Sequence, residues 1–107
     1  MLPKKNRAGK KTVEKIFREG KFINSPCLTF KFISNTKISA SRISFIVPKN
    51  IAKLAVKRNL LKRRGYAALG NHIKESPALL GVFIFKKYQD DISILENEIK
   101  NILHRVN

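Results

Sequence analysis

Residues 49–64, near the middle of the chain, constrain the fold more than any other segment. They include seven Lys or Arg residues and no acidic residue, together with Leu54, Leu61 and other apolar side chains. A segment of this kind buries its apolar side by forming an amphipathic helix within a folded domain, which leaves the cations on the outer side. A dense cationic surface on a helix predicts a polyanionic partner.

The rest of the composition favours a small folded domain. The chain has 107 residues, 43% of them hydrophobic, which predicts one domain over residues 1–107 and not a disordered polycation. The formal net charge is +16, and no acidic residue occurs between Gly20 and Ile73. Because so much like charge opposes compaction, we expect nucleic acid as the partner, with an anionic membrane surface as the second class that fits.

The ends of the chain and its single cysteine suggest where the protein works. Cys27 is the only cysteine, so an intramolecular disulfide is excluded, which fits a reducing compartment. No apolar run approaches the ~20 residues that span a bilayer. Residues 1–11 are basic and lack the apolar stretch of a signal peptide. We expect a cytoplasmic protein without membrane contacts, with residues 1–9 as a basic arm.

In the first half of the chain, the spacing of apolar residues predicts a helix followed by strands. Thr12 is expected to cap a short helix that ends near Gly20, with Val13, Ile16 and Phe17 as its apolar stripe. Residues 27–34 and 42–47 alternate apolar and polar side chains, as strands do. The short polar link between them predicts an antiparallel pair. Residues 22–23 are a candidate for one further short strand.

The second half of the chain predicts a helix, a strand and a helix. The basic helix is expected from about Ala52 to Leu69, with Leu54, Leu61 and Ala68 facing the core. Residues 79–86 are apolar on both faces, which predicts a central strand. Asp90 or Asp91 is expected to cap a final helix. The order α-β-β(-β)-α-β-α predicts an α+β fold, a two-layer α-β sandwich.

The spacing within the basic helix points to phosphate and nucleotide contacts. Arg58 and Lys62 are four residues apart, as are Asn59 and Arg63, so these four side chains share one face of a helix. Arg matches phosphate oxygens with a planar fork, and Asn offers a donor and an acceptor to a base edge or a sugar. A merely solvated charged face is the alternative, but it would be expected to have acidic neighbours. Aromatic side chains exposed on a sheet beside cations also bind single-stranded RNA, and the sequence leaves open which Phe residues are exposed.

No catalytic site of the protein's own is expected. His72 and His104 are far apart in the sequence, and His72 is expected at the surface. Metal-ligand spacing, a glycine-rich phosphate loop and a nucleophile motif are all absent from the sequence. A nuclease made of protein alone is therefore disfavoured.

Several motifs occur in an order that resembles a known family. They are Val-x-x-Ile-Phe-Arg-x-Gly at residues 13–20, Arg-Ile-Ser-Phe-Ile-Val at 42–47, and Ala-Val-Lys-Arg-Asn-Leu-Leu-Lys-Arg at 55–63. A Gly-Val-Phe-Ile-Phe strand and an amphipathic last helix follow. Together they are similar to the protein subunit of bacterial ribonuclease P over nearly the whole chain.

The resemblance implies an α-β sandwich with an unusual left-handed βαβ crossover. It implies that the chain binds ribonuclease P RNA and the 5′ leader of precursor tRNA, as a monomer or a weak dimer. In that family the RNA subunit cuts the phosphodiester bond with Mg²⁺ that is bound mainly by the RNA, and the protein alone binds no cofactor. A ribosomal or general RNA-binding protein without a role in cleavage is the alternative, and a DNA-binding role is a further one.

The resemblance also assigns roles to individual residues. The RNA-binding residues that it implies, with the adjacent Arg64 added as a further cation, are Lys49, Lys53, Arg58, Asn59, Lys62, Arg63 and Arg64. The residues implied at the cleft for the leader are Phe17, Phe30, Val13 and Tyr66. The chain departs from the family at several positions among and beside these residues. Leu60 and Tyr66 stand where Arg is usual, Asn50 stands where Lys is usual, and Arg64 stands where an apolar residue is usual.

Overall fold

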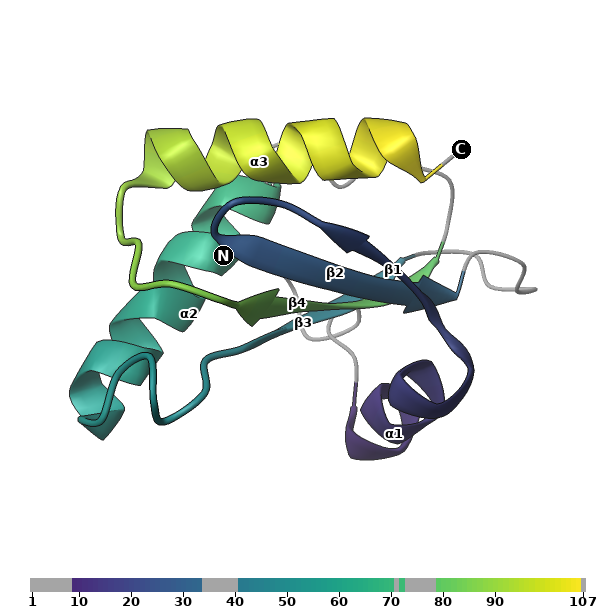
Figure 1. Cartoon of the computed structure of the whole chain (residues 1–107), viewed down its shortest axis with the longest axis horizontal. Coiled ribbons are helices and arrows are strands. Elements are labelled where there is room, and N and C mark those ends of the chain that lie inside the picture. The colour runs from purple at the N-terminus through teal and green to yellow at the C-terminus, as the bar shows by residue number, and fades with distance from the viewer. Residues whose placement is uncertain (1–8, 34–40, 71, 73–78, 107) are drawn as a thin grey trace.

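Figure 1 shows the fold as a computed structural model, which describes residues 9–33, 41–70, 72 and 79–106. The elements are α1 (Lys10–Glu19), β1 (Lys21–Asn24), β2 (Leu28–Ile33), β3 (Arg42–Ile46), α2 (Ala55–Gly70), β4 (Leu80–Phe85) and α3 (Ile92–Arg105). This confirms the predicted order, and the candidate strand at residues 22–23 is β1. Most of the predicted arm, the link at 35–41 and the loop at 75–77 lie outside the described residues.

The strands form one mixed sheet in the order β1-β2-β4-β3. β4 is antiparallel to β2 and parallel to β3. The predicted antiparallel pair of residues 27–34 and 42–47 is therefore wrong, because β4 lies between β2 and β3. β4 is apolar on both faces, so the central position buries more of its surface than an edge would.

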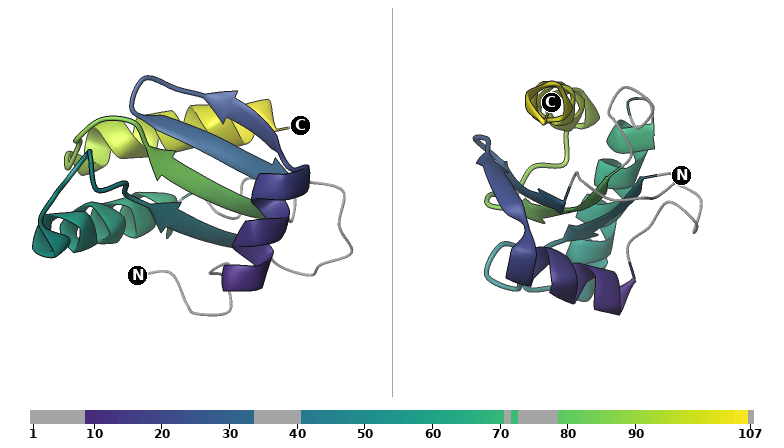
Figure 2. Two further views of the ribbon diagram at one scale, coloured as in Figure 1. Left: turned by 60° about the horizontal axis from the view of Figure 1, so that its bottom comes forward. Right: turned by 90° about the vertical axis from the view of Figure 1, so that its right-hand side faces the viewer.

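Helices cover both faces of the sheet, as the two views in Figure 2 show. α2 and α3 pack on one face and enclose the main core, whereas α1 packs on the other face over a smaller cluster around Ile16 and Val82. An apolar row crosses all four strands on the main-core face. Its members are Ile23, Phe30, Phe83 and Phe45. Three of these rings stack, with centroids 4.3 Å apart for Phe30 and Phe83 and 5.0 Å apart for Phe45 and Phe83.

The connection from β3 through α2 to β4 is a left-handed crossover. The left panel of Figure 2 is seen from the α1 side, with α2 behind the sheet. In that view the parallel strands β3 and β4 run towards the left, and β4 lies above β3. About 98% of such connections are right-handed. The family resemblance implied this rare hand, about which the spacing of apolar residues carries no information.

Helix boundaries differ from the predictions at two places. α1 begins at Lys10 with Gly9 as its N-cap, so Thr12 lies inside the helix and does not cap it. α2 begins at Ala55 and not at Ala52, because the N–H groups of Ile51 and Ala52 bond to the carbonyl of Pro48 and form a separate turn. The end of α1 at Gly20 and the cap of α3 by Asp91 are as predicted.

Gly65 lets α2 approach the sheet closely. It is buried in the middle of the helix, where a Cβ atom would lie 2.6 Å from the ring of Phe45. Glycine costs a helix interior about 1 kcal/mol relative to alanine. Here the close approach of helix and sheet offsets that cost.

Glu98 ties the β1–β2 turn to α3, and its loss should destabilise the fold. Its carboxylate accepts hydrogen bonds from the Ser25 hydroxyl and from the backbone N–H of Cys27, the latter at 2.9 Å between N and O. We expect Glu98→Ala to lower the free energy of unfolding by about 1–3 kcal/mol, since two partly buried donors lose their acceptor. Urea unfolding followed by circular dichroism measures this. Asn97→Ala, at an exposed position on the same helix, is the control, and an equal loss in both variants would contradict the prediction.

Candidate RNA-binding site

The predicted RNA-binding residues lie on α2 and on the turn before it, and we call them the basic surface. They are Lys49, Lys53, Arg58, Asn59, Lys62, Arg63 and Arg64. Most of these side chains are exposed, but Arg58 and Lys62 are half-buried. The predicted common face therefore divides into an outer part with Asn59 and Arg63 and a part nearer the core with Arg58 and Lys62.

Arg58 has a structural role that the sequence did not reveal. Its Nη1 atom donates hydrogen bonds to the carbonyl oxygens of Ala52 at 3.0 Å and Lys53 at 2.7 Å. The guanidinium thus holds the turn that carries Lys49 and Lys53 against the first turn of α2. Arg58 organises part of the basic surface in addition to presenting its own charge.

Leu54 is not a core residue, contrary to the prediction. It precedes α2, so the helical spacing that was expected to turn it inward does not apply, and 67% of it is exposed. Leu61 and Ala68 face the core as predicted. Val56 is also exposed, so the cations at the start of α2 are interspersed with apolar side chains.

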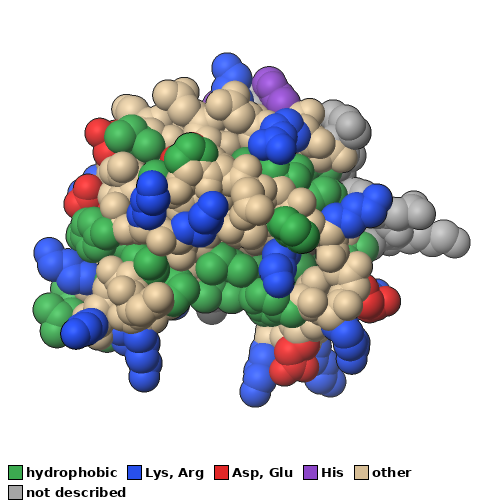
Figure 3. Space-filling view, viewed as in Figure 1, with side chains coloured by type: hydrophobic (Ala, Val, Ile, Leu, Met, Phe, Trp, Pro, Cys, Tyr) green, Lys and Arg blue, Asp and Glu red, His purple; other side chains and the backbone are tan. Residues whose placement is uncertain are grey.

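The charge of the basic surface is not neutralised within the described part of the chain. None of the Lys and Arg side chains of α2 forms an ion pair with a described Asp or Glu. In Figure 3, Lys and Arg side chains occupy two protruding lobes, formed by α1 and by the start of α2, on either side of an apolar hollow. A negatively charged strand lying in this hollow would have cations on both sides.

An exposed aromatic group lies on the sheet face that α1 partly covers. Phe17 of α1 is 43% exposed, and the Lys31 ammonium lies 4.7 Å from its ring centroid. Phe22 pairs with Lys31 across β1 and β2, so both project from this face, and Phe22 is 63% exposed. We call Phe17, Phe22 and Lys31 the aromatic patch. Sequence reasoning did not identify Phe22 and Lys31 as site residues. The alternation of side chains along each strand could have done so, because it places these two on the face opposite Ile23 and Phe30.

Phe30 does not belong to this surface, although the resemblance implied it at the cleft for the leader. It is 0% exposed and projects from the opposite face of the sheet into the main core. The alternation of β2 sends Leu28, Phe30 and Phe32 to that face and Thr29 and Lys31 to the other. A nucleic-acid strand cannot reach Phe30 in this fold.

The two other residues predicted for the cleft are partly engaged in packing. Val13 is half-buried against the small cluster under α1. The Tyr66 hydroxyl accepts a hydrogen bond from the backbone N–H of Phe45 at 3.3 Å, and its ring meets the Phe45 ring edge to face. Tyr66 therefore closes part of the exposed edge of β3.

Among the residues that the structure describes, the remaining polar and titratable groups do not form a catalytic constellation. His72 was predicted at the surface, but only 11% of its side chain is exposed, and its Nε2 lies 2.8 Å from the carboxylate of Glu96 in α3. Burial raises the pKa of the Cys27 thiol, and the nearby Glu98 raises it further, so this thiol is not an activated nucleophile. Within the described segments, no group of three or more His, Cys, Asp or Glu side chains is placed to hold a metal ion. None of the described helices is long and apolar enough to cross a membrane.

Known proteins share both the sequence pattern and the fold. The family model for ribonuclease P matches residues 2–107. The ribonuclease P protein component of Pseudanabaena sp. (strain PCC 6903) is 27% identical, over 96% of this chain and 92% of that protein. The RNase P protein of Thermotoga maritima superposes with a TM-score of 0.82 at 23% identity, covering 94% of this chain and 97% of that one. The RNase P protein of Staphylococcus aureus gives 0.78 at 18% identity, covering 94% and 93%. A family match over almost the whole chain, together with the same fold, means that this chain belongs to the ribonuclease P protein family.

Proposed function

We propose that the chain acts as the protein subunit of ribonuclease P and assists removal of the 5′ leader from precursor tRNA. The basic surface binds the RNA subunit, and the aromatic patch holds the single-stranded leader. The observation that carries the proposal is the exposed pair of Phe17 and Phe22 beside Lys31, on the face opposite the buried Phe30. Such aromatic side chains beside cations suit unstacked bases.

In this proposal the RNA performs the chemistry and the protein positions the substrate. Mg²⁺ is bound mainly by the RNA and supplies Lewis-acid chemistry at the phosphodiester. The basic surface fits this division, because its charged side chains are all Lys and Arg, which do not ligate Mg²⁺. Lys49 and Lys53 instead place positive charge close to the RNA phosphates, which strengthens binding where the backbones of the RNA subunit and precursor tRNA lie close together.

Reconstitution tests the proposal directly. The protein is mixed with a ribonuclease P RNA and a precursor tRNA at a Mg²⁺ concentration that barely supports the RNA alone. We expect the protein to raise the rate of leader removal, because its cations reduce phosphate repulsion between the two RNAs. If the folded protein binds the RNA but leaves the rate unchanged, the proposal is wrong and a general RNA-binding role remains.

The salt dependence of RNA binding tests the basic surface separately. We expect Lys53→Ala with Lys62→Ala to reduce the slope of log affinity against log salt by about one to two units, because each lost phosphate contact removes about 0.7–0.9. The measurement is filter binding of ribonuclease P RNA at several salt concentrations. Lys87→Ala with Lys100→Ala removes the same charge away from α2, and an identical slope change in this control would contradict the assignment.

A further inference from the structure

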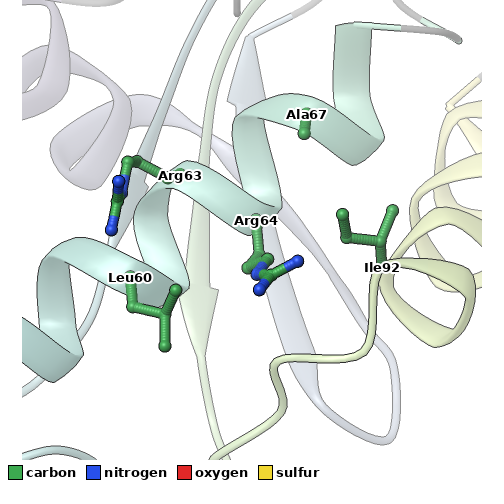
Figure 4. A pocket seen from close by; sticks show the side chains of 5 residues that line it. All are labelled: Leu60, Arg63, Arg64, Ala67 and Ile92. Carbon is green, nitrogen blue, oxygen red and sulfur yellow. The ribbon is translucent and has the colours of Figure 1, made fainter.

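A small pocket opens between α2 and the start of α3, away from the aromatic patch. Its volume is about 280 Å³, and its lining residues are Leu60, Arg63, Arg64, Ala67 and Ile92. In Figure 4 the Arg64 side chain extends from α2 between the side chains of Leu60 and Ile92. α2 and α3 pack on the sheet face opposite α1, so this pocket and the aromatic patch belong to opposite sides of the sheet.

The helical spacing explains how one side of α2 builds this pocket. Positions 60, 63, 64 and 67 recur at three- and four-residue intervals and so form one continuous stripe. This stripe lies beside the buried residues Leu61, Gly65 and Ala68, which face the core. Ile92, the first residue of α3, faces the stripe from the other side and is half-buried against the core. The pocket is thus built on two packed helices and not on a loop.

The lining combines apolar walls with two guanidinium groups. Leu60, Ala67 and Ile92 offer surface that suits the flat face of a ring, while Arg63 and Arg64 suit either phosphate oxygens or the face of an aromatic ring. The volume falls just below the ~300–1,000 Å³ typical of pockets for drug-sized ligands. A single nucleobase with its phosphate matches both the chemistry and the size.

We infer that this pocket, the α2–α3 pocket, receives one unstacked base of the ribonuclease P RNA, with the adjacent phosphate bound by Arg63 and Arg64. The inference rests on the proposed function and adds a base-binding site to the basic surface. Asp91 adjoins Ile92, and its carboxylate is occupied by the backbone N–H groups of Ser93 and Ile94. Because that carboxylate repels phosphate, the base lies towards Ile92 and the phosphate towards Arg63.

The first test fills the pocket without changing its charge. We expect Ala67→Leu to lower affinity for ribonuclease P RNA by about 5- to 150-fold, the range that corresponds to the loss of one stacked base. The slope against salt should stay unchanged, because no phosphate contact is removed. Ala55→Leu, which adds the same side chain at an exposed position on α2 outside the pocket, should bind like the wild type. Equal affinity of the two variants would overturn the inference.

The second test uses the unaltered protein and small probes, so it does not depend on whether a variant folds. Methyl resonances of Leu60, Ala67 and Ile92 are followed by NMR during titration with each of the four nucleoside monophosphates and with ribose 5-phosphate. We expect nucleotides to shift these resonances saturably at concentrations at least tenfold lower than ribose 5-phosphate does. Equal responses would mean that only phosphate is bound, and the inference would fail.

These outcomes separate the inference from the proposed function. If the wild-type protein stimulates leader removal but Ala67→Leu and Ala55→Leu behave alike, the pocket assignment is wrong and the function stands. If the wild-type protein fails to stimulate cleavage while nucleotides still bind in the pocket, the assignment to ribonuclease P RNA is wrong. In that case the pocket is a nucleotide site that serves another RNA.

Discussion

Phe30→Ala is expected to lower the free energy of unfolding by about 3–5 kcal/mol, because it removes a fully buried ring from the centre of the main core. Phe30 stacks on Phe83 and Phe32, so the cavity would be bounded by closely packed aromatic rings that cannot easily fill it. The total free energy of unfolding of a natural protein is roughly 5–15 kcal/mol, so much of the stability would be lost. Urea unfolding followed by circular dichroism measures the change.

Phe17→Ala is the matched control, because the same side chain is removed from the opposite side of the sheet. Phe17 is partly exposed, so we expect a loss below about 1 kcal/mol. Phe30→Leu, which retains much of the buried volume, should be intermediate and provides a folded variant if Phe30→Ala does not fold. Comparable losses for Phe17→Ala and Phe30→Ala would show that the two rings are not divided between surface and core.

Phe17→Ala with Phe22→Ala is expected to weaken binding of precursor tRNA by the assembled holoenzyme about 30-fold or more. Stacking on an aromatic side chain contributes about 1–3 kcal/mol per base, and two such side chains are removed. Mature tRNA, which lacks the leader, should bind the variant and the wild type equally. The measurement is the ratio of the two dissociation constants in the presence of ribonuclease P RNA.

Tyr88→Ala is the control for this double variant, because Tyr88 is an exposed aromatic residue outside the aromatic patch. Its removal should leave the ratio unchanged. Lys31→Gln should lower affinity for precursor tRNA less than the double variant does, since it removes charge but leaves both rings. If the double variant loses affinity for mature and precursor tRNA alike, the aromatic patch does not bind the leader.

The positions of the elements were largely predictable, because each depends on local spacing. The alternation at residues 27–34 and the doubly apolar run at 79–86 are properties of neighbouring residues, and both strands form where that pattern occurs. The pairing of strands depends on which arrangement buries most apolar surface. A short link favours adjacent strands, but the greater burial of β4 places it between β2 and β3.

The assignment of site residues was less predictable, since exposure is decided by distant parts of the chain. Phe17 and Phe30 look equivalent as candidates. Phe30 is core because α2 and α3 pack on its face of the sheet, whereas Phe17, on α1 at the other face, stays partly exposed. Leu54 and Leu61 are seven residues apart, which suggests one helical face. The turn after Pro48 makes α2 begin at Ala55, however, and so leaves Leu54 outside the helix. The hydrogen bonds of Arg58 to the preceding turn likewise require the folded geometry.

The sequence by itself determined the acid-free basic helix, its suitability for a polyanion and the family, because these depend on residue types and their spacing. Only the tertiary structure decided the order of the strands, with β4 between β2 and β3, and the division of the aromatic side chains between core and surface. It also brought Ile92 against the stripe of α2 that contains Leu60 and Arg64. The physical reason is that these features arise from packing between segments far apart in the chain, which a local pattern does not encode.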